Sequence, residues 1–203
     1  MPAPDQLSAE KLRADLGNVV IGNEIVVLEQ TTSTNDAVLR LAISETAEGL
    51  VVFAEHQTAG RGQRGNVWES AAGQGLWFSI LLRPKIDIDQ SARLTKWAAK
   101  TVAQTIEEEL SLRAAIKLPN DVLIDGRKVA GVLVEMRAQK QESHIAVAGI
   151  GVNVTHGADD FPPELRASAG SLALALGHPL DRHRLAVALL RNLDRSYREI
   201  FRA

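Results

Sequence analysis

Apolar and polar positions alternate along the chain with two periods, one typical of strands and one typical of helices. Short runs rich in apolar and β-branched residues, bounded by turn residues, indicate strands. Such stretches occur at 24–30, 49–57, 75–84, 114–138 and 144–154. The stretch 114–138 has the order strand, hairpin, strand, and Asp125–Gly126 predicts its turn.

The clearest helical pattern lies at 91–110, where apolar residues recur every three or four positions along one stripe. Other segments with helical spacing or helix-start residues are 8–16, which Gly17 should end, 31–43, 164–177 and 180–201. No repeat or low-complexity linker divides the chain. The pattern therefore predicts one α+β domain, 1–203, with a mixed or antiparallel sheet packed with helices and an N-terminal stub at 1–22.

Composition limits the function more than the fold. The net charge of −2 gives no pull toward nucleic acid or a membrane surface. The absence of cysteine excludes disulfides, thiolate metal sites and thiol nucleophiles, and the five histidines have no metal-ligand spacing, so we expect no zinc site. No apolar run reaches the roughly 18 residues of a membrane span, and the charged N-terminus lacks a signal-peptide core. We expect a cytoplasmic protein.

The strongest local signal is the segment GRGQRG, residues 60–65, which lies between two predicted strands. Its glycines allow a backbone to approach a ligand closely, and its two arginines offer planar donors for phosphate or carboxylate. The spacing is not that of a P-loop, and glycines between strands do not fit a dinucleotide-binding turn. A basic hairpin tip and an RNA-binding segment are the alternatives. We also expect the 60–68 loop to be mobile without ligand.

A second cluster, KLPND followed by GRKVAG, contains Lys117, Asp121 and Lys128. Lys117 would neutralise phosphate, Asp121 would ligate Mg²⁺ or position a neighbour, and Lys128 would face a carboxylate or its developing acyl phosphate. Each residue also has an ordinary explanation. Pro-Asn-Asp is common turn chemistry, and an isolated strand lysine is usually solvated.

In order, spacing and content, TTSTND, AEHQTAGRGQRGNVW, KLPNDVLIDGRKVAGVLVE and GIGVNV resemble the biotin–protein ligases, from about Glu29 to the C-terminus. The resemblance implies an α+β catalytic domain related to lipoate ligases. It also implies a reaction in which ATP and Mg²⁺ activate biotin to biotinyl-5′-AMP. The biotin is then transferred to a lysine of a biotin carboxyl carrier protein domain, without a prosthetic group or an enzyme nucleophile.

The resemblance also assigns residues to the site. Those implied to contact the substrates are Ser33, Thr34, Asn35, Gln57, Gly60, Arg61, Gly62, Arg64, Trp68, Lys128, Gly131 and Asn153. Trp68 would cover the ligand when the loop closes. Lys128, Arg64 and Lys117 would carry the chemistry, and Asp121 would lie near phosphate and metal.

The sequence departs from the family pattern in several places. Leu118 stands where the family usually has Trp. Gln63 stands where a third basic residue is common, and this second departure predicts weaker phosphate binding. The final 40 residues predict no SH3-like barrel, and the N-terminal stub leaves no room for a winged helix-turn-helix. We therefore expect no DNA partner, and an exposed strand edge is the place where two subunits would pair.

Four other functions share parts of this pattern. A lipoate–protein ligase shares the fold and the adenylate chemistry, but its Arg-rich triple-glycine motif is not found here. A non-catalytic biotin-binding module would not need four phosphate-directed cations, Arg61, Arg64, Lys117 and Lys128. Nucleic-acid binding through 60–65 conflicts with the acidic net charge, and an octanoyl transferase would need a cysteine.

Overall fold

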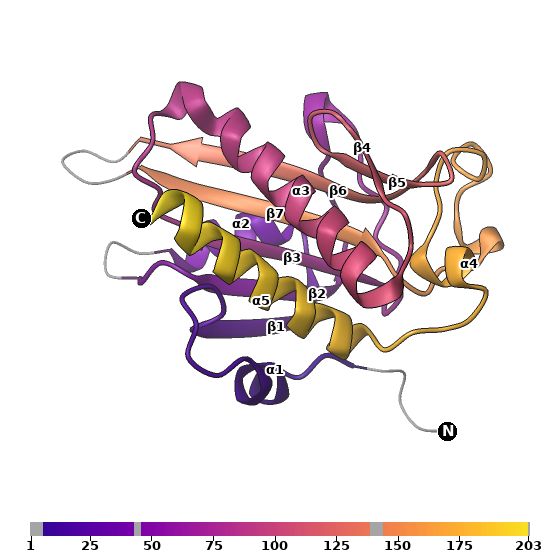
Figure 1. Cartoon of the computed structure of the whole chain (residues 1–203), viewed down its shortest axis with the longest axis horizontal. Helices are drawn as coiled ribbons and strands as arrows, with labels where there is room; N and C mark the ends of the chain where they lie inside the picture. Colours follow the sequence, from indigo (N-terminus) through magenta and orange to yellow (C-terminus); the bar gives the residue numbers. More distant parts are fainter. Residues whose placement is uncertain (1–5, 43–45, 139–143, 203) are drawn as a thin grey trace.

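The computed structural model describes residues 6–42, 46–138 and 144–202, and a mixed sheet forms its centre (Figure 1). Within these residues the strand order is β1-β2-β3-β7-β6-β5-β4. Only β1 and β2 pair in parallel, and every other neighbouring pair is antiparallel. The strands are β1 (Glu24–Thr31), β2 (Leu50–Gln57), β3 (Gly75–Leu82), β4 (Ala115–Lys117), β5 (Asp121–Ile124), β6 (Arg127–Arg137) and β7 (Ile145–Asn153). The predicted α+β class is confirmed.

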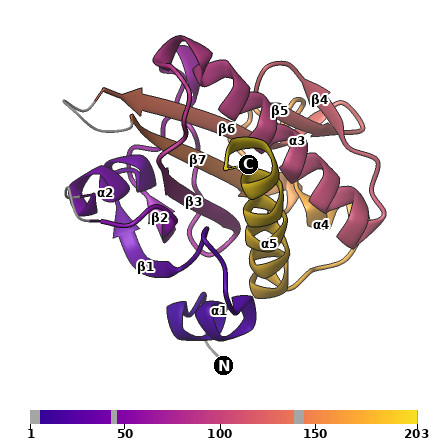
Figure 2. The ribbon, with the colours of Figure 1, turned by 60° about the vertical axis from the view of Figure 1, so that its left-hand side comes forward.

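Helices cover both faces of this sheet. The long helices α3 (Ser91–Leu110) and α5 (Arg182–Phe201) lie across one face, whereas α2 (Thr34–Leu41) packs on the other, as Figure 2 shows. Helix α1 (Ala9–Leu16) contacts α5 and β1, and ends at Gly17 with φ of 74°. Predicted helix 31–43 is shorter at its start, and its last residue, Ile43, lies outside the described residues.

Alternation along the strands assigns side chains to these two faces. Leu76, Phe78 and Ile80 of β3 belong to the large core beneath α3 and α5, together with alternate residues of β6 and β7. The intervening residue Ser79 contacts α2 instead, beside a smaller core that includes Val38. The α2 face therefore carries polar side chains beside its smaller core. The candidate site lies on this face.

The β5–β6 hairpin follows the sequence prediction. Asp125 and Gly126 both have positive φ, 49° and 76°, which is the backbone that the turn between twisted antiparallel strands requires. The hairpin places Asp121 opposite Gly131 in the strand register. The motif residues of 117–131 are thus brought to neighbouring positions on three strands.

The helix predicted over 164–177 is wrong for most of its length. Only α4 (Leu172–Leu176) is helical, after the short 3₁₀ helix η3 (Ala158–Asp160). Two other 3₁₀ turns are η1 (Gln63–Gly65) and η2 (Ile88–Gln90). Residues 168–170 instead pair with the start of β6, where Lys128 N donates to Ser168 O at 2.7 Å and Gly170 N to Lys128 O at 2.9 Å. These tertiary hydrogen bonds replace the helical ones.

A buried ion pair links α5 to β2, and its carboxylate also binds the N-terminal segment. Arg182 of α5 donates to Glu55 of β2 at 2.8 Å and to the carbonyl of Gly75 at 3.0 Å, and Leu7 N donates to the Glu55 carboxylate at 2.9 Å.

Of the helices in the described ranges, none combines the length and apolarity of a membrane span.

Candidate active site

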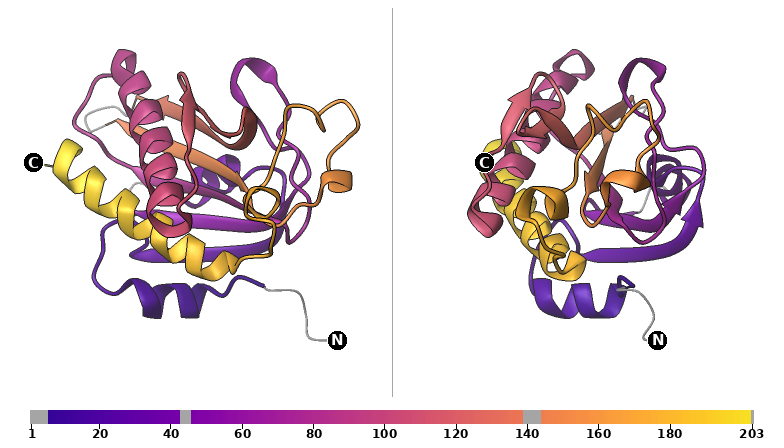
Figure 3. Two further views of the ribbon diagram at one scale, coloured as in Figure 1. Left: turned by 45° about the vertical axis from the view of Figure 1, so that its right-hand side comes forward. Right: turned by 90° about the vertical axis from the view of Figure 1, so that its right-hand side faces the viewer.

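Three glycines form the floor of a cleft on the α2 face, between the start of α2, the 58–74 loop and strands β6 and β7. Figure 3 shows the 154–171 segment beside the 58–74 loop, and residues of both line neighbouring cavities. Gly131 and Gly151 are register partners on β6 and β7, and Gly149 lies two residues earlier on β7. A Cβ atom on Gly149 would lie 2.3 Å from Asn35 Oδ1, and one on Gly151 would lie 2.6 Å from the Trp68 ring. The floor must lack side chains for these neighbours to lie on it.

One end of the cleft, here called the amide end, consists of Ser33, Thr34, Asn35 and Gln57 with Ser79 behind them. Gln57 Oε1 accepts from the backbone N–H of Thr34 at 2.8 Å and so caps α2 from the end of β2. The Ser79 hydroxyl donates to Asn35 Oδ1 at 2.6 Å and lies 2.7 Å from Thr34 Oγ1. Ser33 is the N-cap residue but its side chain makes no capping hydrogen bond. Its hydroxyl is available to a ligand.

The two loop arginines have different surroundings. Arg61 pairs with both oxygens of Asp36, at 2.7 and 2.8 Å, and lies 3.3 Å from Glu135. This hydrogen-bonded pairing holds the pKa of Asp36 below its ordinary value and raises that of Arg61. Arg64, with φ of 58°, forms no ion pair within the described part of the chain and does not line the cleft. Gly60 packs against Gln57 and the Trp68 carbonyl, and Gly62 lines the cleft.

The opposite end, here called the lysine end, contains Lys117, Asp121 and Lys128. Lys128 Nζ lies 2.7 Å from Asp121 Oδ1 and 5.1 Å from the centre of the Trp68 ring. Trp68 and Lys128 both lie over Gly131 of the glycine floor, and the Trp68 Nε1 is buried without a hydrogen-bond partner among the described residues. Lys128 and Trp68 border two adjoining spaces, so this end connects them.

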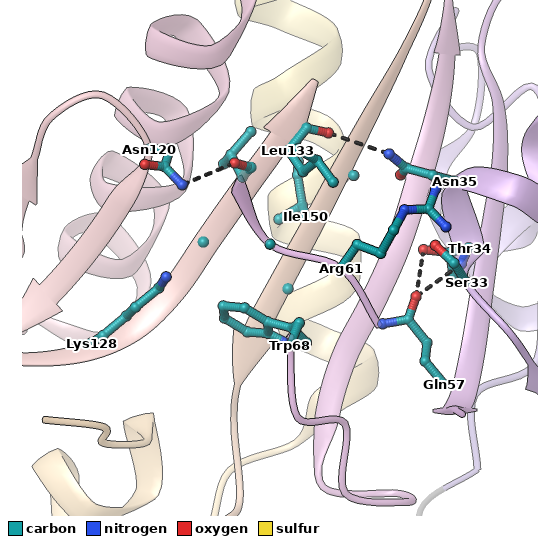
Figure 4. Close-up of a pocket in the computed structure, with 15 residues that line it drawn as sticks. Ser33, Thr34, Asn35, Gln57, Arg61, Trp68, Asn120, Lys128, Leu133 and Ile150 are labelled. Carbon is teal, nitrogen blue, oxygen red and sulfur yellow. Dashed lines mark hydrogen bonds between the residues drawn. The ribbon is translucent and has the colours of Figure 1, made fainter. Parts of the chain in front are cut away.

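The first space is a cleft with about 430 Å³ of free volume including its open mouth. Figure 4 shows Lys128 at one side, the amide end at the other, and Trp68 and Arg61 between them. The second space, of about 890 Å³ including its open mouth, is lined by Lys117, Asp121 and Asn153 with Phe161. Of the predicted residues, all but Gly60 and Arg64 therefore line one of two connected cavities.

Several residues of the site were not singled out in the sequence. Glu135, Ser79 and Asn120 touch its edge, and Gly149 and Gly151 form its floor. The glycines have a detectable signal, since GIG inside an apolar strand marks close backbone approach. Glu135 and Ser79 do not, because a strand Glu or Ser is normally solvated.

The lysine end does not fit a magnesium ion held by the protein. Mg²⁺ prefers near-octahedral oxygen ligands, usually one or two carboxylates with phosphates. Asp121 already pairs with Lys128, and among the described residues Glu69 is the one other carboxylate that lines this cavity. Within 6–42, 46–138 and 144–202 there is no cluster of three or more His, Cys, Asp and Glu residues that suits a metal.

The chain is similar to known ligases in sequence. Residues 27–153 match the biotin/lipoate A/B protein ligase family. The bifunctional ligase/repressor BirA of Bacillus spizizenii is 38% identical over 196 residues, which are 97% of this chain and 60% of that protein. A biotin–(acetyl-CoA-carboxylase) ligase of Mycobacterium tuberculosis is 34% identical over 84% of this chain and 63% of its own length. The chain thus spans less than two thirds of either relative.

Solved structures share the fold. A biotin protein ligase from Aquifex aeolicus in complex with biotin and ATP superposes with a TM-score of 0.76 and 28% identity, covering 89% of this chain and 72% of that chain. A biotin protein ligase from Leishmania major in complex with biotinyl-5-AMP gives a TM-score of 0.71 at 23% identity and covers 89% of this chain and 77% of its own. At that lower identity the likeness concerns the fold alone.

Proposed function

The chain belongs to the biotin/lipoate A/B protein ligase family, and we propose that it is a biotin–protein ligase that activates biotin with ATP and transfers it to a carrier lysine. One observation carries the proposal: a glycine-floored cleft joins a neutral amide end to a cationic lysine end. Biotin has the matching shape, a flat ureido ring at one end and a carboxylate at the other. Similarity to the Aquifex ligase, solved with biotin and ATP, supports the assignment.

Charge orients the ligand in this cleft. At the amide end Asp36 and Glu135 share the Arg61 guanidinium, and Arg40 and Arg137 also lie close enough to lower the pKa of Asp36. At the opposite end Lys128, paired with Asp121, is the cation that borders the cleft, and Lys117 and Glu69 line the adjoining cavity. A ligand with N–H donors at its head and a carboxylate at its tail is favoured with the carboxylate at Lys128 and the head at the oxygen acceptors of the amide end. Lipoate has no N–H donor in its dithiolane ring.

The first step follows from this orientation. A biotin carboxylate oxygen attacks the α-phosphorus of ATP, the bond from that phosphorus to the bridging oxygen breaks, and pyrophosphate leaves. We assign Lys128 to the carboxylate and the charge that develops on the α-phosphate, and Lys117 to the phosphate side in the adjoining cavity. Arg64, which is unpaired within the described residues, is assigned to the adenylate phosphate. Asp121 is assigned to positioning Lys128 rather than to metal.

In the second step the carrier lysine amine attacks the acyl carbon, and AMP leaves. No enzyme nucleophile is required. Mg²⁺ would enter with the nucleotide phosphates and supply charge neutralisation there. The carrier domain, pairing of subunits through an edge strand and a role without DNA are part of this proposal. The formal net charge of −2 supports the last point.

Calorimetric titration with biotin and then with lipoate, each with and without Mg·ATP, tests the assignment. We expect tight biotin binding, no heat with lipoate, and pyrophosphate release on addition of ATP. Biotin binding without pyrophosphate release would instead indicate a biotin-binding module. Binding of lipoate alone would reassign the substrate and keep the family.

A further inference from the structure

One carboxylate joins the amide end to the glycine-rich loop. Glu135 Oε2 accepts from Asn35 Nδ2 at 2.6 Å, and Arg61 Nη2 lies 3.3 Å from the same oxygen. Glu135 lies on β6, two residues from the floor-lining Leu133, and about a third of its side chain is exposed. No other described residue contacts both the Asn35 amide and the loop arginine.

Glu135 determines which way the Asn35 amide faces. A carboxylate only accepts hydrogen bonds, so the amide nitrogen must point at Glu135 and the oxygen toward the Ser79 hydroxyl, 2.6 Å away. The Asn35 oxygen also lies against the Gly149 floor. A flipped amide would place its nitrogen beside Ser79 and its oxygen beside a carboxylate oxygen. Glu135 therefore determines that the amide oxygen of Asn35, and not its nitrogen, lies closest to the glycine floor.

Glu135 also holds the start of the loop. The Arg61 guanidinium is fixed by Asp36 on one side and by Glu135 on the other, which ties residue 61 to α2 and to β6. The isolated bridge between Arg61 and Val67 closes the loop on itself, so the anchored residue and Trp68 lie at the same base. The Glu135 carboxylate thus holds both the position of the loop and the orientation of the Asn35 amide.

We propose that Glu135 is a positioning residue that couples recognition of the ligand's ring to closure of the 60–68 loop. This rests on the proposed function, since it concerns the same cleft. Glu135 touches neither the reacting carboxylate nor the phosphate; it acts through Asn35 and Arg61. Loss of its charge should weaken binding of biotin and loosen the loop, and should leave the nucleotide cavity around Lys117 unaffected.

The test compares Glu135→Gln with Glu135→Asp, Asp36→Asn and the matched control Glu29→Gln, which changes an exposed strand glutamate that makes no hydrogen bond or ion pair with the described residues. Gln keeps the shape, but its neutral amide binds Asn35 more weakly and can flip. We expect the biotin Kd to rise about tenfold, the difference between a charge-assisted and a neutral hydrogen bond. The KM for ATP and the unfolding midpoint should match the control, and Glu135→Asp should recover part of the affinity.

Limited trypsin digestion without ligand, with mass analysis of the cut after Arg64, reports on the loop. Glu135→Gln and Asp36→Asn should both speed this cut, whereas only Glu135→Gln should also raise the biotin Kd by the full amount. A biotin Kd equal to the control, or equal losses for biotin and ATP with a lower unfolding midpoint, would overturn the proposal. If the wild-type chain binds no biotin, the proposed function fails, and the cleavage ratio alone decides whether Glu135 holds the loop.

Discussion

Gly149→Ala tests the glycine floor with the smallest change that the chain allows. The added methyl would lie 2.3 Å from Asn35 Oδ1 and 3.0 Å from its Cγ, closer than van der Waals contact permits. Gly149 sits in a strand with ordinary φ, so the backbone itself accepts alanine. The Asn35 side chain must therefore rotate away and lose its bonds to Ser79 and Glu135.

The structure gives the size of the effect. A neutral hydrogen bond contributes about 0.5–1.5 kcal/mol and one to a charged group about 1.5–3 kcal/mol. Both bonds join protein groups, so their loss should lower the unfolding free energy by about 2 kcal/mol or more, of which the lower entropy of the unfolded chain with Ala offsets about 0.4–1 kcal/mol. The displaced Asn35 should also lose its own hydrogen bond to biotin, which weakens binding by about 1.4 kcal/mol, roughly tenfold in Kd.

Calorimetric biotin titration and urea unfolding measure the two quantities on the same sample. Gly157→Ala is the matched control, since the nearest atom to its Cβ would be an Asp160 carboxyl oxygen at 3.4 Å. A Gly149→Ala protein that binds biotin within about threefold of that control would refute the reasoning. Asn35 would then not be a ligand contact, and the floor would serve packing alone.

Other predictions concern the lysine end, the loop and two buried groups. Lys128→Ala should reduce biotin-dependent pyrophosphate release at least about 100-fold while circular dichroism stays unchanged, and unchanged release would remove its assigned role. Arg64→Gln should speed dissociation of biotinyl-AMP more than that of biotin; equal changes would indicate a structural role instead. Burial lowers the pKa of His156 from 6.5 to about 4, so the unfolded chain takes up a proton first and stability should fall as pH drops from about 6.5 to 4, by up to about 3 kcal/mol. His156→Phe should flatten that slope in urea unfolding at several pH values. Glu55→Ala should lower the unfolding free energy by about 3–5 kcal/mol, because it leaves the buried Arg182 without its carboxylate; a loss below about 1 kcal/mol would show that water reaches the pair.

Sequence pattern was sufficient to predict the elements that residues close together in the sequence determine. The 91–110 stripe, the Asp125–Gly126 turn and the stop at Gly17 each depend on residues within a few positions, and all three appear in the fold. The predicted helix at 164–177 failed because its cause is not local. Apolar spacing there suits a helix, but Lys128 and Asn153 bind residues 168–170 from across the sheet.

The residues of the candidate site also fall into two groups, those that residue type identifies and those that only the fold brings to the site. Chemistry-bearing motifs such as Ser33-Thr34-Asn35 reveal themselves by residue type, and the fold gathers them in one cleft. Ser79 has no such signal, since its importance comes from a 2.6 Å contact with a residue 44 positions away. The packing of α2 against β3 brings the two residues together, and that packing is a tertiary property. A single sequence has no means of ranking such a serine above any other.

The loop arginines show what geometry adds to a motif. In the sequence, Arg61 and Arg64 are equivalent cations between glycines, and both are predicted to hold phosphate. In the structure Arg61 is neutralised by Asp36 and Glu135, so a phosphate would have to displace two carboxylates to reach it. Arg64 has no such partner among the residues that the structure describes, and it stands in a left-handed backbone, where glycine would be favoured. Substituting Arg64 by Gly would therefore change the charge and relieve the backbone together, whereas Gln changes the charge alone. We therefore propose different roles for the two arginines: Arg61 anchors the loop, and Arg64 binds the adenylate.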